Sequence, residues 1–346
     1  MSVLLTGASG FIAAVILDQL VKKDYKIVAT VRNQEKADWI NKLYPNANIA
    51  ISFVGDIAED GAFDQTFKDH SDIEYVLHTA SPFHFNHTDP EKDILNPAIK
   101  GTTGILHSIK KYGPNVKHVV VTSSFAAMLN SYTWPAKEDY TEESWNPVTY
   151  EDSLKPENTY IGSKKLAEKV LWDFVEQEKP SFTASTVNPV MVFGPGFHKV
   201  NSADAINTSN KAIYDAFHAT EEASQNLRGG SVLPFVHVND VAAAHVVAIE
   251  NPKAAAGKRW LATSGLYDAQ LLLDTINKVA PELKGKIPVG KPYSAEEIKE
   301  LEKTWPRLDN SATQKQTGIK FAGLDESVAD TLKFLQKLDE QWGTSI

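Results

Sequence analysis

A tyrosine and a lysine four residues apart, Tyr160 and Lys164, are the side chains with the clearest potential for chemistry in this sequence. The chain has 11 tyrosines, and only Tyr160 is followed by a lysine at this spacing. Residues four apart share a helix face, and apolar periodicity predicts a helix over residues 159–176. A predicted strand upstream ends in the paired serines Ser123 and Ser124. These three groups together could act on a carbonyl. The phenol would donate a proton to the carbonyl oxygen, the ammonium would lower the pKa of the phenol, and a serine hydroxyl would orient the carbonyl.

A glycine-rich turn near the amino end supplies the second motif. Gly7 and Gly10 follow the apolar run at residues 3–5 and precede an apolar-periodic segment, which predicts a strand, a turn and a helix. Gly7 permits a tight turn, Gly10 lets the backbone approach a ligand, and Ala13 stands where a third glycine is usual. The helix amino terminus would then face a dinucleotide pyrophosphate, although plain strand–helix turns also contain short glycine patterns. The residues expected to contact this pyrophosphate are Gly7, Ser9, Gly10, Phe11 and Ile12.

The end of the second predicted strand, residues 27–31, indicates the type of dinucleotide. NAD sites place an acidic residue here, whereas NADP sites place positive charge near the ribose 2′-phosphate. Arg32 follows the strand directly, Lys36 comes four residues later, and the first acid is Glu35. Because a guanidinium binds phosphate through paired hydrogen bonds, the pattern favours NADPH, with two solvated surface cations as the alternative.

These motifs and several others resemble the extended short-chain dehydrogenase/reductase family over nearly the whole chain. The matching segments are Gly7-x-x-Gly10-x-x-Ala13, Asp56-Ile57, His78-Thr79-Ala80-Ser81, Thr122-Ser123-Ser124, Tyr160-x-x-x-Lys164, Asn188-Pro189-Val190 and His237-Val238-x-Asp240-Val241. Within that family, residues 77–83 and 104–111 are similar to yeast NADPH-dependent methylglyoxal and carbonyl reductases, whose plant relatives are dihydroflavonol and cinnamoyl-CoA reductases. The resemblance implies a Rossmann-type fold and NADPH-dependent reduction of aldehydes and ketones to alcohols.

The resemblance also implies a role for each matching side chain. Tyr160 would protonate the carbonyl oxygen, its pKa lowered toward neutrality by Lys164 and the cationic nicotinamide. Lys164 would also hydrogen-bond the nicotinamide ribose, and Ser124 would orient the substrate, with Ser123 as the alternative. Asp56 would accept a hydrogen bond from the adenine amino group or merely cap the next helix. Further expected cofactor contacts are Ile57, Ala80, Ser81, Pro189 and Val192. The expected walls of an apolar substrate pocket are Phe83, Phe85, Phe125 and Met191, for which ordinary core packing is the alternative.

Strands and helices alternate along the first half of the chain, which predicts right-handed crossovers and a doubly wound, parallel α/β sheet. The expected strands there are residues 3–6, 27–31, 49–54, 75–79, 118–122 and 183–187, and the expected helices start at residue 11 and cover 35–43, 93–111 and 159–176. Beyond residue 188 we expect strands at 231–235 and 259–262 and helices at 204–220, 238–250, 269–279, 295–303 and 324–341. Residues 1–188 would form an NADP-binding domain with the catalytic residues, and 189–346 mainly a substrate-binding lid with segments returning to the sheet.

Composition excludes several classes of protein. Without cysteine, the chain has no disulfide, thiolate metal site or cysteine nucleophile, and a reducing compartment is permitted. A net charge of −9 argues against general nucleic-acid binding, and no apolar run is long enough to span a membrane. The first predicted strand begins so close to Met1 that we expect no signal peptide and a cytoplasmic protein.

Other catalytic classes lack their motifs. Ser9 does not have the glycine spacing of a serine hydrolase, no Gly-Lys-Ser/Thr follows the turn as in P-loop ATPases, and no His-Glu-x-x-His motif indicates a metal. Two alternatives remain, a sugar-nucleotide epimerase or dehydratase of the same fold and a non-catalytic NADP-sensing protein. Arg32 argues against most of the former, which retain NAD, and the Ser124, Tyr160 and Lys164 set argues against the latter. The expected partner is a small carbonyl compound, and the sequence leaves monomer and homodimer open.

Overall fold

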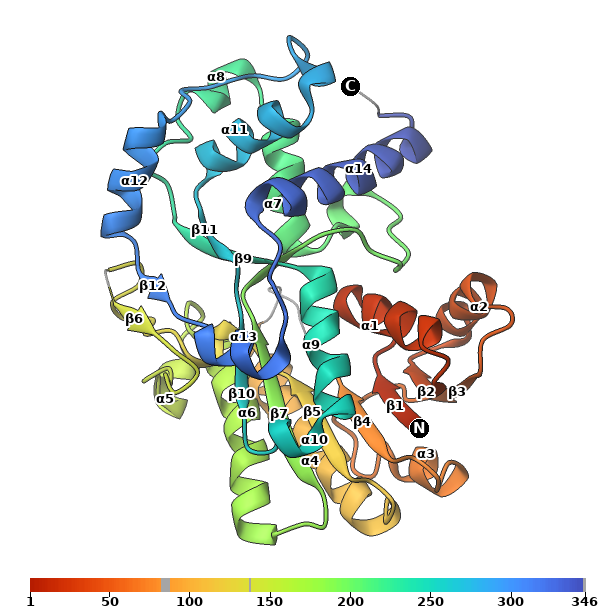
Figure 1. Cartoon of the computed structure of the whole chain (residues 1–346). Coiled ribbons are helices and arrows are strands. Elements are labelled where there is room, and N and C mark those ends of the chain that lie inside the picture. Colours follow the sequence, from red (N-terminus) through yellow and green to blue (C-terminus); the bar gives the residue numbers. More distant parts are fainter. Residues whose placement is uncertain (82–87, 137, 345–346) are drawn as a thin grey trace.

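A seven-stranded sheet lies at the centre of the chain in the computed structural model, which describes residues 1–81, 88–136 and 138–344 (Figure 1). Its strands, all parallel, are β1 (Ser2–Thr6), β2 (Lys26–Val31), β3 (Ile49–Phe53), β4 (Tyr75–His78), β5 (His118–Thr122), β7 (Thr183–Pro189) and β10 (Arg259–Ala262). They lie in the order β10-β7-β5-β4-β1-β2-β3. The strands are short, largely apolar runs, and most are buried because helices cover both faces of the sheet. The predicted doubly wound parallel sheet is therefore confirmed.

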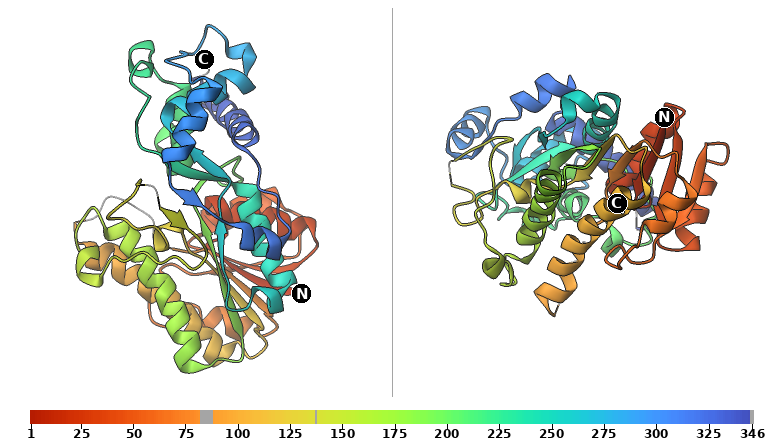
Figure 2. Two further views of the ribbon diagram at one scale, coloured as in Figure 1. Left: turned by 60° about the vertical axis from the view of Figure 1, so that its left-hand side comes forward. Right: turned by 90° about the horizontal axis from the view of Figure 1, so that it is seen from below.

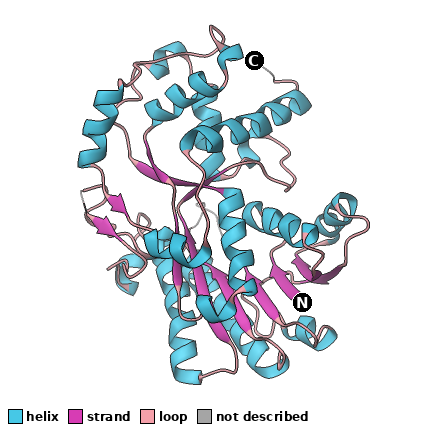
Figure 3. Cartoon of the chain, viewed as in Figure 1, coloured by secondary structure: helices cyan, strands magenta, loops and turns pink. Residues whose placement is uncertain are grey.

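Two layers of helices cover the two faces of the sheet. Figure 3 draws these helices in cyan around the magenta strands. One layer consists of α1 (Phe11–Lys22), α2 (Gln34–Leu43), α9 (Val238–Glu250) and α10 (Pro252–Ala255). The other consists of α3 (Asp64–Asp69), α4 (Asn96–Tyr112) and α6 (Thr159–Glu178), with the π-helical turn Glu91–Leu95 leading into α4. Each layer has its own apolar core against one face of the sheet, so α1 and α6 approach the carboxyl edge from opposite sides.

A smaller part of the chain stands over the carboxyl edge of the sheet (Figure 2). It contains a three-stranded sheet of β8 (Met191–Phe193), β9 (Leu233–His237) and β11 (Gly265–Tyr267). Around this sheet lie α7 (Thr208–Phe217), α8 (Glu221–Ser224), α11 (Ala269–Val279), α12 (Ala295–Thr304), α14 (Leu324–Trp342) and the 3-10 turns Ala203–Ala205 and Pro281–Leu283. Beside it, β6 (Asp139–Tyr140) pairs with β12 (Arg307–Leu308), while α5 (Tyr150–Ser153) packs on α6 and α13 (Ser311–Thr317) packs on β10 and α9. A separate apolar core holds this part together.

Several elements from the carboxyl-terminal half pack with the amino-terminal half. The strand β10 extends the central sheet next to β7, and α9 packs beside α1. These are segments returning to the sheet from beyond residue 188. In the part of the chain that the structure describes, no helix is long and apolar enough to cross a membrane.

Some element boundaries differ from those expected. The helix expected over residues 204–220 is divided into the short turn Ala203–Ala205 and α7, because Ile206 has an extended backbone (ψ 134°) that interrupts the helix. The strand expected at 231–235 lies at Leu233–His237, two residues later. Short elements such as α3, β8 and β11 were not expected, since they contain too few residues to show a periodic pattern.

Candidate active site

The glycine turn packs closely against the carboxyl end of β4. Gly7 has a φ of +63°, a left-handed conformation that favours glycine, and a Cβ at this position would lie 3.1 Å from the Ala80 Cα. The Gly10 N–H donates a 2.9 Å hydrogen bond to the Gly7 carbonyl, and α1 begins at Phe11 without a side-chain cap. The first N–H groups of α1 therefore form an anion-binding end at the edge of the sheet. Ser9, which the sequence also expected to contact the pyrophosphate, is partly buried in this turn.

Positive charge gathers beyond the end of β2. Arg32 is exposed, and Lys36 lies in the first turn of α2, where its N–H donates a 3.1 Å hydrogen bond to the capping Asn33 side chain. The ammonium of Lys199, from the carboxyl-terminal part, lies 3.1 Å from Glu35, and this hydrogen-bonded pairing lowers the pKa of Glu35. Lys199 thus balances the acid that lies between these two cations in the sequence, so the neighbourhood of Arg32 suits a phosphate.

The residues after β3 adopt a turn. Asp56 is exposed, and its Oδ1 accepts a 2.9 Å hydrogen bond from the Ala58 N–H. Ile57 packs against Gly101 of α4, where an added Cβ would come within 2.8 Å of the Ile57 side chain. The alternative role that the sequence left open for Asp56 was capping the next helix, but α3 begins at Asp64 without a side-chain cap. Asp56 instead closes its own turn, which occupies one carboxylate oxygen.

The side chains Ser124, Tyr160 and Lys164 meet at the carboxyl edge of the sheet. Ser124 follows β5, and its hydroxyl accepts a 3.1 Å hydrogen bond from the Ala126 N–H. Tyr160 lies in the first turn of α6 and is hydrogen-bonded to Ser124. The Lys164 ammonium lies 5.9 Å from the centre of the Tyr160 ring and donates a 3.0 Å hydrogen bond to the Ser81 hydroxyl, beyond β4. The three expected groups are therefore neighbours, although they come from separate elements.

The start of α6 is fixed by a close contact with α5. A Cβ at Gly162 would lie only 2.0 Å from the Ser153 hydroxyl, so a glycine is needed for the two helices to approach this closely. Gly162 lies between Tyr160 and Lys164 in the sequence. The contact therefore sets where both side chains enter the site.

Burial changes the pKa of both titrating groups. It raises the pKa of the Tyr160 phenol above its ordinary value, and the hydrogen bond with Ser124 opposes this shift. The sequence counted the charges of Lys164 and of a bound nicotinamide, which would lower this pKa, and the structure adds the desolvation of the phenol, which acts in the opposite direction. Burial also lowers the pKa of Lys164 to about 8. In the protein alone, Tyr160 is therefore a protonated phenol at neutral pH, ready to donate its proton.

A cavity of about 480 Å³ connects these groups. It extends from the glycine turn to Ser124 and Tyr160, and apolar groups dominate its walls. The expected residues that line it are Gly7, Gly10, Phe11, Ile12, Ser81, Ser124, Phe125, Tyr160, Lys164, Pro189, Met191 and Val192. It is large enough for a small organic group beside the catalytic side chains.

Several expected pocket residues have additional roles. Phe125 is buried and packs edge-on against Trp134 and Tyr140, so it belongs both to an apolar core and to the cavity wall. The sequence expected the Val192 backbone to contact the nicotinamide. In the structure the Val192 N–H donates a 3.0 Å hydrogen bond to the Ser209 hydroxyl. Phe83 and Phe85 lie outside the described residues.

Comparison with known proteins places the chain in a family. Residues 3–262 match the NAD dependent epimerase/dehydratase family. The chain belongs to this family. Among its relatives is the NADPH-dependent methylglyoxal reductase of Saccharomyces cerevisiae, which is 42% identical over 351 residues, covering 98% of this chain and 99% of that protein. A ketoreductase of Aspergillus niger is 40% identical and covers 95% of this chain and 96% of its own length.

A solved structure supports the same grouping. The crystal structure of yeast methylglyoxal/isovaleraldehyde reductase complexed with NADPH matches this epimerase/dehydratase family member with a TM-score of 0.89 and 39% identity. The match covers 99% of this chain and 100% of the yeast chain. The family and the Rossmann-type fold implied by the sequence motifs are therefore confirmed.

Sequence reasoning missed part of the site of this family member. The additional wall residues include Leu129, Trp134, Ile161, Asn207 and Leu233, which come from four different segments. Trp134 lies in the long connection between β5 and α6, whose aromatic content was the available signal. Among the described residues, no group of three or more His, Cys, Asp or Glu side chains could hold a metal ion.

Proposed function

We propose that this protein is an NADPH-dependent carbonyl reductase that converts aldehydes and ketones, methylglyoxal-like compounds among them, to alcohols. The observation that carries the proposal is the meeting of Ser124, Tyr160 and Lys164 at one cavity with the open amino end of α1. The yeast relative named for NADPH-dependent methylglyoxal reduction supports the same activity.

The residues present fit a dinucleotide. Gly7 carries no Cβ where the turn approaches Ala80, and α1 begins without a side-chain cap on its first N–H groups. The glycine turn would hold the pyrophosphate, Arg32 and Lys36 the 2′-phosphate, and Lys164 the nicotinamide ribose. The remaining contacts proposed are those of Ser9, Phe11, Ile12, Asp56, Ile57, Ala80, Ser81, Pro189 and Val192. When bound, NADPH supplies the hydride for the carbonyl carbon.

The catalytic side chains would then complete the reduction. Ser124 holds the carbonyl oxygen next to the phenol, and Tyr160 donates its proton to that oxygen as it gains charge. The positive charge of Lys164 stabilises the resulting phenolate, and solvent returns the proton afterwards. Phe125 and Met191 would contact the apolar part of the substrate, with Phe83 and Phe85 as further candidates.

The two halves of the chain would have different roles, and the protein would be cytoplasmic. We propose that residues 1–188 bind the cofactor and carry the catalytic groups, while most of 189–346 forms the substrate side. A cytoplasmic location is consistent with the absence of cysteine. Fractionation of cells that produce the tagged protein would test the location.

An assay with NADPH, NADH and a panel of aldehydes and ketones tests the activity. We expect loss of absorbance at the reduced-cofactor band with NADPH and at least one carbonyl compound. A sugar-nucleotide epimerase or dehydratase would convert its nucleotide-sugar without net consumption of cofactor. A non-catalytic NADP-sensing protein would bind NADPH without turnover of any compound.

A further inference from the structure

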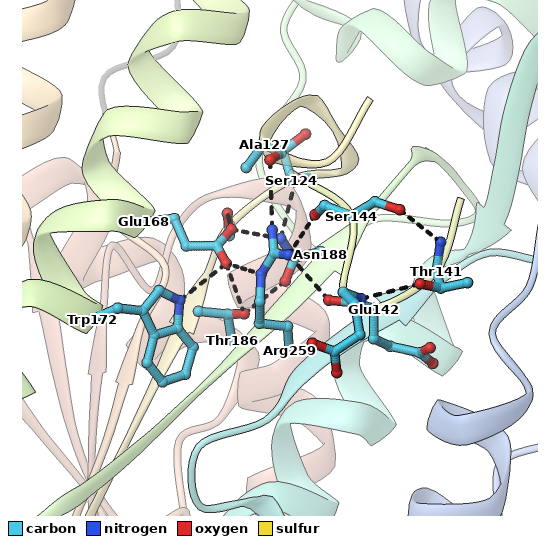
Figure 4. Close-up of polar contacts among 12 residues, drawn as sticks. Ser124, Ala127, Thr141, Glu142, Ser144, Glu168, Trp172, Thr186, Asn188 and Arg259 are labelled. Carbon is cyan, nitrogen blue, oxygen red and sulfur yellow. Dashed lines mark hydrogen bonds and ion pairs between the residues drawn. The ribbon is translucent and has the colours of Figure 1, made fainter. Parts of the chain in front are cut away.

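Glu168 lies on the helix of the proposed catalytic tyrosine, with its carboxylate turned toward Asn188 and Arg259 (Figure 4). Only 1% of this residue is exposed. It comes eight residues after Tyr160 and four after Lys164, so the three side chains follow one face of α6. The hydrogen bonds that its Oε2 accepts come from Ser123 Oγ at 2.5 Å and Asn188 Nδ2 at 2.7 Å.

Two of these contacts lead directly to Ser124. Ser123 precedes it in the chain, and Asn188 Nδ2 also lies 3.2 Å from the Ser124 carbonyl oxygen, to which it donates. The Thr186 hydroxyl fixes Asn188 with a 2.7 Å hydrogen bond to its Oδ1. One carboxylate on the helix of Tyr160 therefore holds the backbone that carries Ser124.

The other carboxylate oxygen of Glu168 is connected to the wall of the cavity through Arg259. Its Oε1 accepts a 2.5 Å hydrogen bond from Arg259 Nε, at the start of β10. The guanidinium donates to the carbonyls of Glu142 (3.0 Å), Ser144 (2.5 Å) and Ala127 (3.5 Å), and lies 3.9 Å from the centre of the Trp145 ring. These carbonyls belong to the connection between β5 and α6 that also contributes Leu129 and Trp134 to the cavity.

A buried ion pair adds little net stability, because the cost of desolvation offsets most of the attraction. Its arrangement here instead ties together the helix of Tyr160, the backbone of Ser124 and a wall of the cavity. We propose that Glu168 and Arg259 are positioning residues: Glu168 sets Ser124 against Tyr160, and Arg259 sets the cavity wall. This inference rests on the proposed reductase function.

The geometry explains why the hydrogen bonds of Glu168 should affect turnover. Glu168 and Tyr160 are separated by about 12 Å along one rigid helix, so a shift at one end moves the other. A misplacement of about 1 Å between reacting groups can reduce a rate by ~100-fold. The hydrogen bond between Ser124 and Tyr160 joins two separate elements, and Glu168 joins the same two elements a second time.

The test removes one link at a time in the full-length protein. Ser123→Ala deletes the shortest link on the Ser124 side without leaving Arg259 unpaired. We expect kcat to fall by roughly 10-fold while the Kd for NADPH, measured by fluorescence, stays unchanged. The matched control is Trp172→Phe, which removes a 3.2 Å hydrogen bond to Glu168 Oε1 that leads neither to Ser124 nor to the cavity wall. This control should keep the wild-type kcat.

A double-mutant cycle separates positioning from general stability. In a Ser124→Ala background, Ser123→Ala should lower kcat no further, because the hydroxyl that it positions is already absent. Arg259→Lys keeps the charge but loses most carbonyl contacts, and we expect it to raise the KM for the carbonyl substrate several-fold more than it lowers kcat.

Three outcomes would overturn the inference. The first is an unchanged kcat in Ser123→Ala. The second is a Ser123→Ala change that lowers kcat by the same factor in the wild-type and Ser124→Ala backgrounds, and the third is a Trp172→Phe variant that loses as much kcat as Ser123→Ala. A wild-type protein that turns over no carbonyl compound with NADPH would instead contradict the proposed function itself. The two failures are therefore distinguishable in one set of assays.

Discussion

The ammonium of Lys164 donates a 3.0 Å hydrogen bond to the hydroxyl of Ser81, which joins α6 to the carboxyl end of β4 across the cavity. Lys164 is thereby held between the Tyr160 ring and the strand end at which a nicotinamide ribose is expected. Its side chain can act on both the phenol and the cofactor, and the predictions for this site start from that double position.

Replacement of Tyr160 tests the proton donor. Tyr160→Phe keeps the ring but removes the phenol, so turnover should fall by at least about 100-fold while the Kd for NADPH stays near the wild-type value. Steady-state rates and a fluorescence titration would measure the two quantities. Tyr150→Phe is a suitable control, since the Tyr150 phenol bonds Glu91 at the exposed start of α5. A Tyr160→Phe variant with most of its turnover would refute the mechanism.

Lys164→Met should damage turnover and cofactor affinity together. We expect kcat to fall by roughly 10- to 100-fold, and the Kd for NADPH to rise, because one ammonium serves the phenolate and the ribose. The neighbouring Lys165 provides a control, as it donates instead to the Val148 carbonyl and can be changed to Met without touching the cavity. Loss of affinity alone would show that Lys164 does not stabilise the phenolate.

Arg32 should determine the choice of cofactor. A charge-assisted hydrogen bond contributes roughly 1.5 to 3 kcal/mol, so Arg32→Ala should lower kcat/KM with NADPH by about 10- to 150-fold and hardly change it with NADH. Lys36→Ala should act in the same direction but more weakly, since solvent screens a flexible lysine. The decisive measurement is the ratio of the two efficiencies at fixed ionic strength. Equal losses with both cofactors would mean that Arg32 does not bind the 2′-phosphate.

Activity should decline above the pKa of Lys164. Burial lowers that pKa to about 8, so the ammonium loses its proton, and its charge, as the pH rises through this value. Tyr160 stays protonated there because burial raises its pKa, and the neighbouring His78 is neutral because burial lowers its pKa to about 4. The kcat/KM for NADPH, which reflects the free enzyme, should therefore fall above about pH 8.

Lys164→Arg provides the check on this assignment. A guanidinium keeps its charge throughout the accessible pH range, so the decline near pH 8 should disappear even if the absolute rate is lower. A decline that persists unchanged in Lys164→Arg would assign it to a different group.

Local sequence determined the elements and the motifs of this protein. The glycine turn at Gly7 and the four-residue spacing of Tyr160 and Lys164 are visible because turns and helix faces depend on residues close together in the chain. The parallel sheet could be predicted for the same reason, since alternating strand and helix patterns leave few topologies.

Only the tertiary structure distinguished the two serines. Both serines border the cavity, but Ser123, which is 6% exposed, donates its hydrogen bond to Glu168, whereas Ser124 is hydrogen-bonded to Tyr160. Two adjacent hydroxyls have the same chemistry in a sequence, and their directions are set by what packs around each one. The pairing of Glu168 with Arg259, 91 residues later, was equally invisible.

The raised pKa of Tyr160 has the same origin. A sequence shows which charges could approach a phenol, but desolvation depends on how many groups surround it once distant segments have packed together. Spacing along the chain thus determined which chemical groups this protein brings to its site. Packing between distant segments decided the orientation of those groups and their pKa values.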